Sequence, residues 1–255
     1  MTKRTGNSSS RELVGSPVRL STQTRIDISN AVRAVVRYCA APTFIHWRAT
    51  LGISWNVRTT SLFDRRFQRG TVAGLSMHTF ADAIYASEAA DTRSVSGGLV
   101  MCGGACVSWF SPGWTQNCVT LSTTQAEHVA LADLMKEVLF PGQIWRFSLP
   151  GVVMPVIPVF EDNAGAVQLA QIPITSCNTS MCVYHFLRKL EARKEISAIR
   201  VASDFQHADF LTTQQSLKTL SNSTAMLRWI VYILAVTFCF MVEVYWFQGR
   251  REDFE

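Results

Sequence analysis

The stretch HTFADAIYASEAADTRSVSGGLVMCGG, residues 78–104, has the pattern of two strands joined by a polar turn. Its first strand carries Asp82 inside the apolar frame 79–83. A carboxylate on a buried strand is costly unless a partner neutralises it. Asp82 is therefore expected either at an exposed strand end or against a positively charged group.

Strand and helix patterns alternate on both sides of this stretch, which predicts an α/β architecture: a mixed sheet of about five strands with flanking helices. The expected strands are 78–83, 94–104, 105–111, 118–123, 152–163 and 196–203. The expected helices are 122–140, 164–171, 183–195 and one that begins within 205–213. Ser122 and Gln125 have capping-box spacing, and Pro141-Gly142 is expected to end or break the helix at 122–140.

Residues 1–70 have a different character and are expected to be mostly helical. Apolar residues recur at helical spacing over 27–41, a second apolar helical segment covers 44–57, and residues 1–10 are expected to be disordered. This part carries 12 Lys and Arg but 3 Asp and Glu, whereas residues 71–220 carry 9 and 12. A basic part beside an acidic one indicates either a polyanionic partner or an ordinary solubilising surface.

Residues 221–255 form a third part, a hydrophobic tail. Its uncharged run at 229–242 is borderline for a membrane span, which needs about 18 or more apolar residues. We expect either a buried or partner-binding helix or a membrane contact through 229–247. The polar N-terminus lacks the apolar core of a signal peptide, and seven irregularly spaced cysteines fit a reducing, intracellular compartment.

Three further carboxylates stand where chemistry is common, although each has an ordinary explanation. Glu127 lies near the start of a helix, on the same helical stripe as the apolar residues 131, 134 and 138. Its ordinary explanation is that the helix end is exposed there. Asp162 follows a strand and has the position of a helix N-cap. Asp209 stands at the start of the last helix, where a negative charge is favourable. If these side chains converge with Asp82, they repel each other unless hard cations such as Mg²⁺ neutralise them.

The order and spacing of seven motifs resemble the ribonuclease H domain of copia-type retrotransposon polyproteins. The motifs are ADAIYAS, RSVSG, VSW, LSTTQAEHVAL, EDNAGAVQLA, YHFLRK and QHADFLTT. The resemblance implies a ribonuclease H-like fold at 71–220, preceded at 1–70 by a remnant of the reverse transcriptase thumb and connection. The polymerase's own catalytic aspartates would lie upstream of this chain, so DNA synthesis is not expected.

By this resemblance, Asp82, Glu127, Asp162 and Asp209 are the catalytic, metal-binding tetrad for two Mg²⁺ ions, with Mn²⁺ as a substitute. Asp82 and Asp162 would hold one or both ions, Glu127 the ion on the leaving side, and Asp209 the ion that activates water. The implied reaction is hydrolysis of the RNA strand of an RNA–DNA hybrid, beside the rest of a reverse transcriptase. The residues expected to grip phosphates are Arg188, Lys189, Arg193, Lys194, Arg65, Arg66 and Arg69.

The sequence also departs from the family pattern. SCNTSM at 176–181 stands where the family reads close to RTKHID, which removes basic and polar groups. Ile84 replaces the second Asp of the family's ADAD. Two alternatives to the active enzyme therefore stay open: a catalytically inactive relic that binds nucleic acid, and a fragment tethered to a membrane. A basic helix at 183–195 is also an ordinary solvated face in many proteins, and His207 is expected at the surface.

Overall fold

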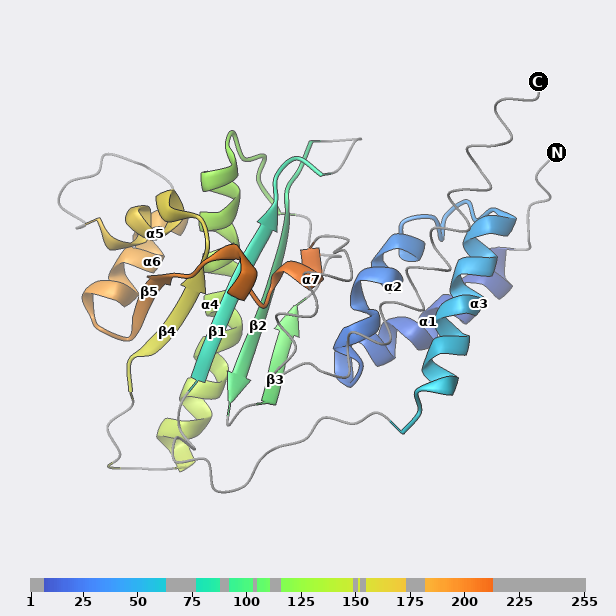
Figure 1. Cartoon of the computed structure of the whole chain (residues 1–255), viewed down its shortest axis with the longest axis horizontal. Helices are drawn as coiled ribbons and strands as arrows, with labels where there is room; N and C mark the ends of the chain where they lie inside the picture. Colours follow the sequence, from blue (N-terminus) through green and yellow to red (C-terminus); the bar gives the residue numbers. More distant parts are fainter. Residues whose placement is uncertain are drawn as a thin grey trace. The chain divides into compact units, whose positions relative to one another are not determined.

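The computed structural model describes residues 7–62, 77–87, 92–102, 105–110, 116–148, 151, 155–172 and 182–212. These residues fall into two compact units, one within residues 1–64 and the other within residues 65–215. Figure 1 shows a helical unit and a unit built on a sheet.

The described part of the first unit is helical. Its helices are α1 (Asn7–Gln23), the 3₁₀ helix η1 (Ile26–Ile28), α2 (Ser29–Val36) and α3 (Phe44–Thr59). They enclose a small apolar core that includes Val14, Val32 and Ile53. The expectation of disorder is wrong for residues 7–10, which belong to α1, and the helix expected at 27–41 is shorter because α2 ends at Val36.

A buried ion pair fixes the turn between α1 and α2 in this unit. The Arg25 guanidinium donates to both carboxylate oxygens of Asp27, at 2.9 and 2.8 Å, and to the Thr60 hydroxyl at 2.7 Å. These bonds satisfy both buried charges, so Arg25 has a structural role and is not displayed to solvent.

The second unit contains a mixed sheet of five strands, as the sequence predicts. The strands are β1 (Met77–Ile84), β2 (Val95–Cys102), β3 (Ala105–Phe110), β4 (Ile157–Glu161) and β5 (Ile196–Arg200), in the order β3-β2-β1-β4-β5. The hairpins β1–β2 and β2–β3 are antiparallel, while β4 runs parallel to β1 and to β5. The sheet therefore turns from antiparallel to parallel at β1, the strand that carries Asp82.

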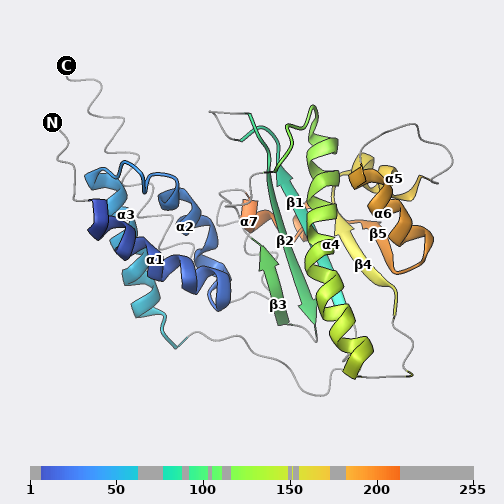
Figure 2. The ribbon, with the colours of Figure 1, turned by 180° about the vertical axis from the view of Figure 1, so that it is seen from behind.

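Helix α4 (Thr123–Ser148) packs along β1 and β2, with α5 (Ala164–Gln171) and α6 (Cys182–Ala192) beside it (Figure 2). Its buried side includes Leu131, Leu134 and Val138, which meet Val100 and Val159 of the sheet in one apolar core. Burial of side chains of this size contributes about 1.5–3 kcal/mol each, so the core places α4 firmly.

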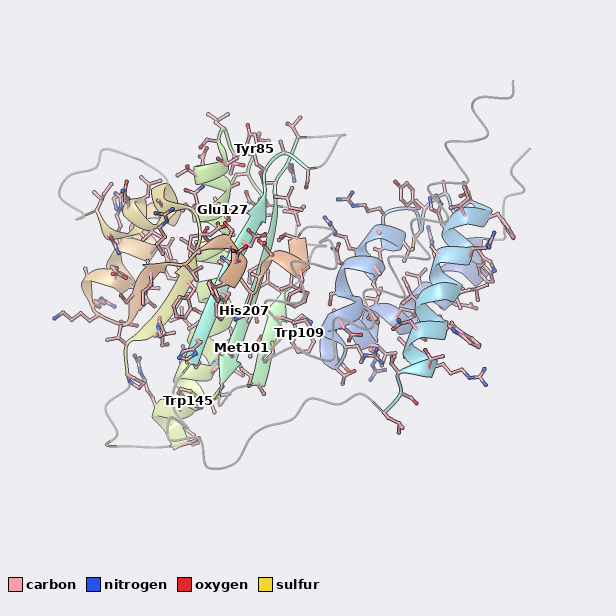
Figure 3. The ribbon with its side chains drawn as sticks, viewed as in Figure 1. Tyr85, Met101, Trp109, Glu127, Trp145 and His207 are labelled. Atoms are coloured by element: carbon pink, nitrogen blue, oxygen red, sulfur yellow. The ribbon has the colours of Figure 1, made fainter. Side chains whose placement is uncertain are left out.

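At the start of α4 one bond of the expected capping box is formed and the other is displaced by one residue, and the end of the helix differs from the expectation. The Ser122 hydroxyl accepts from the Gln125 amide at 3.2 Å, and the Gln125 side chain accepts from the Leu121 amide at 2.7 Å. Pro141 does not end the helix, which continues to Ser148. A proline inside a helix removes one backbone hydrogen bond. Trp145, which follows Pro141 by one turn, packs against the core and stabilises the last part of the helix (Figure 3).

The strand expected at 118–123 is also wrong. Residues 118–122 form an irregular segment before α4, with Val119 and Leu121 exposed, and Thr123 already belongs to the helix. The Thr120 hydroxyl lies 2.6 Å from the Ser94 hydroxyl, and the Gln116 amide donates to the Ser94 carbonyl at 2.9 Å. Hydrogen bonds to Ser94, rather than pairing with a neighbouring strand, thus position this segment.

The C-terminal end of the unit returns to the central strands. After β5 come the 3₁₀ helix η3 (Ser203–Phe205) and the short helix α7 (Asp209–Thr212), which packs on β1 and β2. The buried Gln206 side chain donates to the Ala81 carbonyl at 2.7 Å. A Cβ atom at Gly97 would lie 2.7 Å from Thr212 Cγ2, so a glycine in β2 admits α7 to this position.

Candidate metal centre

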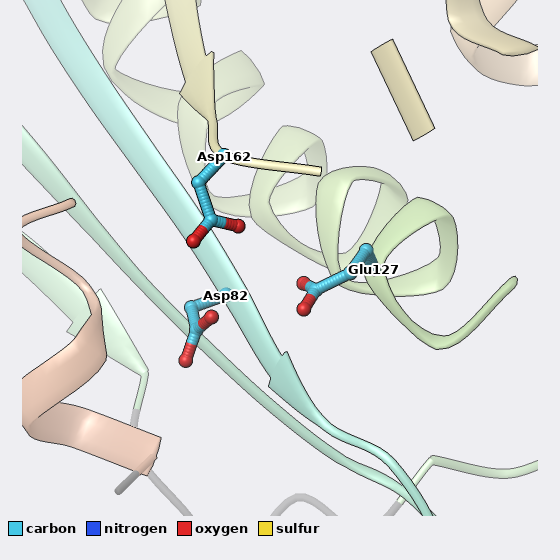
Figure 4. Close-up of side chains that lie close together, drawn as sticks. All are labelled: Asp82, Glu127 and Asp162. Carbon is cyan, nitrogen blue, oxygen red and sulfur yellow. The ribbon is translucent and has the colours of Figure 1, made fainter. Parts of the chain in front are cut away.

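Three carboxylates converge at one edge of the sheet. Asp82 lies near the end of β1, Glu127 in the first turns of α4, and Asp162 directly after β4. One carboxylate oxygen from each lies within 4.8 Å of the others (Figure 4). Asp82 and Glu127 are buried and Asp162 is half-buried.

Strand register explains why two residues so far apart in the sequence meet. Phe80 of β1 pairs with Phe160 of the parallel strand β4, and their rings stack at 4.9 Å. Asp82 and Asp162 each follow two residues later, so they reach the same edge together. The carboxyl ends of neighbouring parallel strands are a common place for ligands.

Asp82 is a buried carboxylate, 6% exposed, so the explanation by an exposed strand end is wrong. Its Oδ2 accepts a hydrogen bond from the Thr212 hydroxyl. Burial raises the pKa of Asp82 from 3.8 to about 6, against the lowering effect of the Thr212 bond and with a further contribution from the Asp162 charge.

Glu127 is also buried, at 8% exposed, so the explanation by an exposed helix end is wrong for this side chain. Its Oε2 has no hydrogen-bond partner among the described residues. The pKa of Glu127 is raised to about 11, mainly by burial. The negative charges of Glu161, Asp82 and Asp162 also raise it. A cation at this position would remove that penalty by pairing with the ionised form.

Asp162 does not cap α5, although its position in the sequence allows it. Asn163 is the N-cap, and its Oδ1 accepts from the Ala166 amide at 3.1 Å. Asp162 Oδ2 instead accepts from the Ser203 hydroxyl at 2.7 Å. The helix is therefore capped by its neighbour, and the Asp162 carboxylate faces the other two acids.

Glu161 is a fourth acid at this edge that the sequence reasoning missed. It is 0% exposed, its Oε1 accepts from the Asn163 amide at 3.1 Å, and its Oε2 has no hydrogen-bond partner among the described residues. Burial raises the pKa of Glu161 well above its usual value, and the Asp82 and Asp162 charges raise it further. Strand alternation was the available signal, because Glu161 shares the inward face with Val159.

Asp209, the fourth member of the expected tetrad, is not part of the convergent group. It begins α7 and is half-exposed, and its backbone carbonyl accepts from the Thr212 hydroxyl at 3.1 Å. Among the residues that the structure describes, the acids brought together are Asp82, Glu127 and Asp162. The role of Asp209 stays a prediction. The nearby His207, labelled in Figure 3, is half-buried rather than on the surface. The centroid of its ring lies 4.6 Å from the centroid of the Phe80 ring.

The expected phosphate contacts separate into three groups. Arg188 is 2% exposed and its Nε donates to the Leu169 carbonyl at 3.0 Å, so its assignment to a phosphate contact is wrong. The exposed cations at the end of α6 and in the following turn are Lys189, Arg193 and Lys194. Arg65, Arg66 and Arg69 lie outside the described residues, as do the 176–181 segment and the tail at 221–255. Within the described part of the chain, no helix combines the length and the apolar character of a membrane span.

The side chains at this edge fit a hard divalent cation. Every donor is a carboxylate oxygen, which is the ligand type that Mg²⁺ takes. Two buried carboxylate oxygens, Glu127 Oε2 and Glu161 Oε2, have no hydrogen-bond partner among the described residues. Buried acids in this arrangement are stable only when protonated or when a cation neutralises them.

The domain therefore combines a mixed five-stranded sheet, flanking helices and acids from β1, α4 and the end of β4. The chain is 30% identical over 218 residues to the retrovirus-related Pol polyprotein from transposon RE2 of Arabidopsis thaliana, a match that covers 83% of this chain. It is 27% identical over 210 residues to the polyprotein from transposon TNT 1-94 of Nicotiana tabacum, covering 78% of this chain. The homologues of this chain are thus copia-type retrovirus-related Pol polyproteins. The chain spans 14% and 15% of the length of these two relatives.

Two further likenesses involve shorter proteins. Secreted RxLR effector protein 161 from Plasmopara viticola is 32% identical over 127 residues, which are 50% of this chain and 87% of that protein. The solved structure of RNase H1 from Halobacterium salinarum NRC-1 is 15% identical, with a TM-score of 0.35, over 53% of this chain and 93% of that one. No protein-family model matches the chain.

Proposed function

We propose that this chain is a retrotransposon-derived ribonuclease H that cleaves the RNA strand of an RNA–DNA hybrid. The observation that carries the proposal is the convergence of Asp82, Glu127 and Asp162 within 4.8 Å at the edge of the sheet. These residues would hold Mg²⁺, or Mn²⁺ in its place, and two such ions supply an activated water and stabilise the leaving oxygen. Asp209 is the proposed fourth member of the set.

Two hydroxyl groups of the chain would orient two of these acids. Thr212 donates to Asp82 and Ser203 donates to Asp162, which restricts the rotation of both carboxylates. Asn163 takes the capping position of α5, so Asp162 remains available. Groups of this kind commonly change metal affinity or activity by about 10–100-fold when they are removed.

The hybrid would be bound by its shape and backbone. Recognition of 2′-hydroxyls along the minor groove does not depend on base sequence. Lys189, Arg193 and Lys194 are the described cations proposed to contact phosphates, and Arg65, Arg66 and Arg69 are proposed with them. The rest of a reverse transcriptase is the proposed partner, because the chain spans a small part of its polyprotein relatives.

Cleavage of an end-labelled RNA–DNA hybrid in Mg²⁺ or Mn²⁺ tests this function. We expect metal-dependent cutting of the RNA strand, and a loss of more than about a hundredfold in Asp162→Asn, because a direct ligand should matter more than a supporting group. Asp133→Asn is the matched control, since Asp133 lies on α4 and bonds Ser96 and Lys136 instead of the centre. A folded wild-type chain that leaves the hybrid intact contradicts the proposal.

A catalytically inactive relic is the second candidate. The position of Asp209 outside the convergent group favours it, because the expected set of four acids is then incomplete. Such a relic would retain the fold and bind the hybrid and the metal ion without turnover. The cleavage assay and a binding assay on the same wild-type sample separate the two candidates.

A further inference from the structure

We propose that the buried side chain of Gln116 is a positioning residue of the metal centre, which fixes Glu127 of α4 relative to Asp82 of β1. The inference rests on the proposed metal-dependent function and adds a residue that is not one of the expected acids. Gln116 acts by joining two elements of the fold and does not itself bind the metal ion.

The side chain of Gln116 connects the start of α4 to β2. It is 2% exposed, and its Nε2 donates to the Ala126 carbonyl of α4 at 2.9 Å and to the Ser96 hydroxyl of β2 at 3.0 Å. The backbone amide of Gln116 also donates to the Ser94 carbonyl at 2.9 Å, just before β2 begins. One side-chain amide thus bridges the helix and the sheet, while its own backbone is held on the side of the sheet.

Both ends of this bridge lie next to a proposed metal ligand. Ala126 directly precedes Glu127 on α4. Ser96 pairs with Ala83 across the β1–β2 hairpin, and Ala83 directly follows Asp82. Two ligands that come from different elements are therefore linked by one strand pairing and by the two hydrogen bonds of a single side chain (Figure 4 shows the two carboxylates).

The position of Glu127 depends on where α4 lies. The carboxylates of Asp82 and Asp162 each accept a bond from a hydroxyl side chain, whereas Glu127 Oε2 has no hydrogen-bond partner among the described residues. The apolar packing of α4 on the sheet is non-directional, so it tolerates small shifts of the helix. A hydrogen bond has a preferred length and angle, and metal ligands must be held within about 0.5 Å of their working positions. The bridge supplies this directional restraint.

A purely structural role does not account for Gln116. Its Oε1 is buried and has no hydrogen-bond partner among the described residues, which costs free energy of folding. The Ala126 carbonyl lies inside α4, where the amide four residues further along the helix already satisfies it. An apolar side chain of the same length would fill this space without an unpaired polar atom. The bridge therefore restrains geometry at some cost to stability.

Titration calorimetry with Mn²⁺, in the absence of nucleic acid, tests the inference. Gln116→Met keeps the length of the side chain and removes both hydrogen bonds, so we expect Mn²⁺ affinity to fall by about tenfold, as for groups that support metal ligands. We expect the melting temperature of this variant in EDTA to stay close to that of the wild type, because the unpaired Oε1 is removed as well. A loss of affinity without a loss of stability distinguishes positioning from a merely structural role.

Thr120→Val is the matched control. Thr120 is buried in the same segment, and its hydroxyl lies 2.6 Å from that of Ser94, so this bond joins the segment to the sheet side and not to α4. We expect Thr120→Val to melt at a lower temperature in EDTA and to bind Mn²⁺ like the wild type. Equal losses of Mn²⁺ affinity in the two variants would show that Gln116 acts only through the general order of the segment, which overturns the inference.

The remaining outcomes separate this inference from the proposed function. Wild-type Mn²⁺ affinity in Gln116→Met overturns the inference and leaves the proposed function intact. If Gln116→Met does not fold, Ser96→Ala removes the sheet end of the bridge; a smaller loss of affinity is then expected, and an unchanged affinity overturns the inference. A wild type that binds Mn²⁺ but does not cut the hybrid contradicts the proposed function alone. A wild type without measurable Mn²⁺ binding overturns both.

Discussion

Thr212 is the residue on which the orientation of Asp82 depends. It is fully buried, and its hydroxyl donates to Asp82 Oδ2 across 130 positions of sequence. Its methyl group lies where a side chain at Gly97 would have to go. The hydroxyl also lowers the pKa of Asp82, which burial otherwise raises. One small side chain at the end of the unit thus favours the ionised form of a proposed ligand.

Replacing Thr212 tests this dependence. Thr212→Val keeps the shape and removes the donor, so we expect about 1–3 kcal/mol loss in the free energy of unfolding without metal, because a buried acceptor loses its partner. We also expect hybrid cleavage to fall by about 10–100-fold. Thr212→Ser should restore both. Equal behaviour of the Val and Ser variants, measured by urea unfolding and by cleavage, would show that the hydroxyl has no such role.

Helix α6 presents two different faces at the scale of the element. Leu187, Arg188 and Leu190 are buried, whereas Lys189, together with Arg193 and Lys194 just after the helix, is exposed. Arg193 lies 3.8 Å from Glu195, an exposed pair of the kind that contributes little to stability. The exposed cations are therefore available to phosphates at low energetic cost.

A triple variant of this face should weaken hybrid binding. For Lys189→Ala/Arg193→Ala/Lys194→Ala we expect lower affinity and a salt dependence of log K that is shallower by up to about three, because each lost phosphate contact removes about one counterion from the slope. Lys136→Ala is the control, since Lys136 pairs with Asp133 at 2.7 Å. Fluorescence anisotropy across a salt series measures both. An unchanged slope would mean that these three cations do not contact phosphates and form an ordinary solvated surface.

Sequence reasoning succeeded where a local pattern carries the information and failed where packing overrides it. The motif that contains Asp82 predicted a strand, and the spacing of Ser122 and Gln125 predicted the start of α4. Pro141 gave a local signal for a helix end, but Trp145 packs against the core beyond it. Arg188 was expected to be exposed because it is charged, yet the Leu169 carbonyl accepts from it inside the unit.

The candidate site shows the same division. Asp82, Glu127 and Asp162 came from the motifs, and the structure brings them together. The place of Asp209 depends on how α7 returns to β1, which the local pattern does not contain. Glu161 was overlooked because its neighbour Asp162 offered the simpler interpretation, although strand alternation places Glu161 on the buried face with Val159.

At the scale of the whole sheet unit, the buried acids couple stability to pH. Burial raises the pKa of Asp82 to about 6 and that of Glu127 to about 11. A carboxyl whose pKa is raised by folding stabilises the protein below its unfolded value and loses that contribution as pH rises through its folded value. Without metal, these acids therefore oppose folding increasingly as pH rises above about 4.

Melting temperatures measured against pH test this coupling. In EDTA, we expect the wild type to lose stability relative to Asp82→Asn as the pH rises from 4 to 7, because Asn cannot ionise. With saturating Mg²⁺ the difference should narrow or reverse, since the cation binds the ionised acids of the wild type. A difference that does not vary with pH in EDTA would mean that Asp82 titrates as in the unfolded chain.

The return of the chain end to β1 also has a kinetic consequence. Gln206 bonds the Ala81 carbonyl across 125 positions, and Thr212 bonds Asp82 across 130. Contacts of such long sequence separation form slowly, because a large loop must close before they contribute. During synthesis the hairpin of β1 and β2 is the first part of the sheet unit to be made. The contacts of Gln206 and Thr212 with β1 can form only after α7 has been made. A ribosome-bound chain that ends before Gln206 would thus carry Asp82 without Thr212, the hydroxyl donor that orients it.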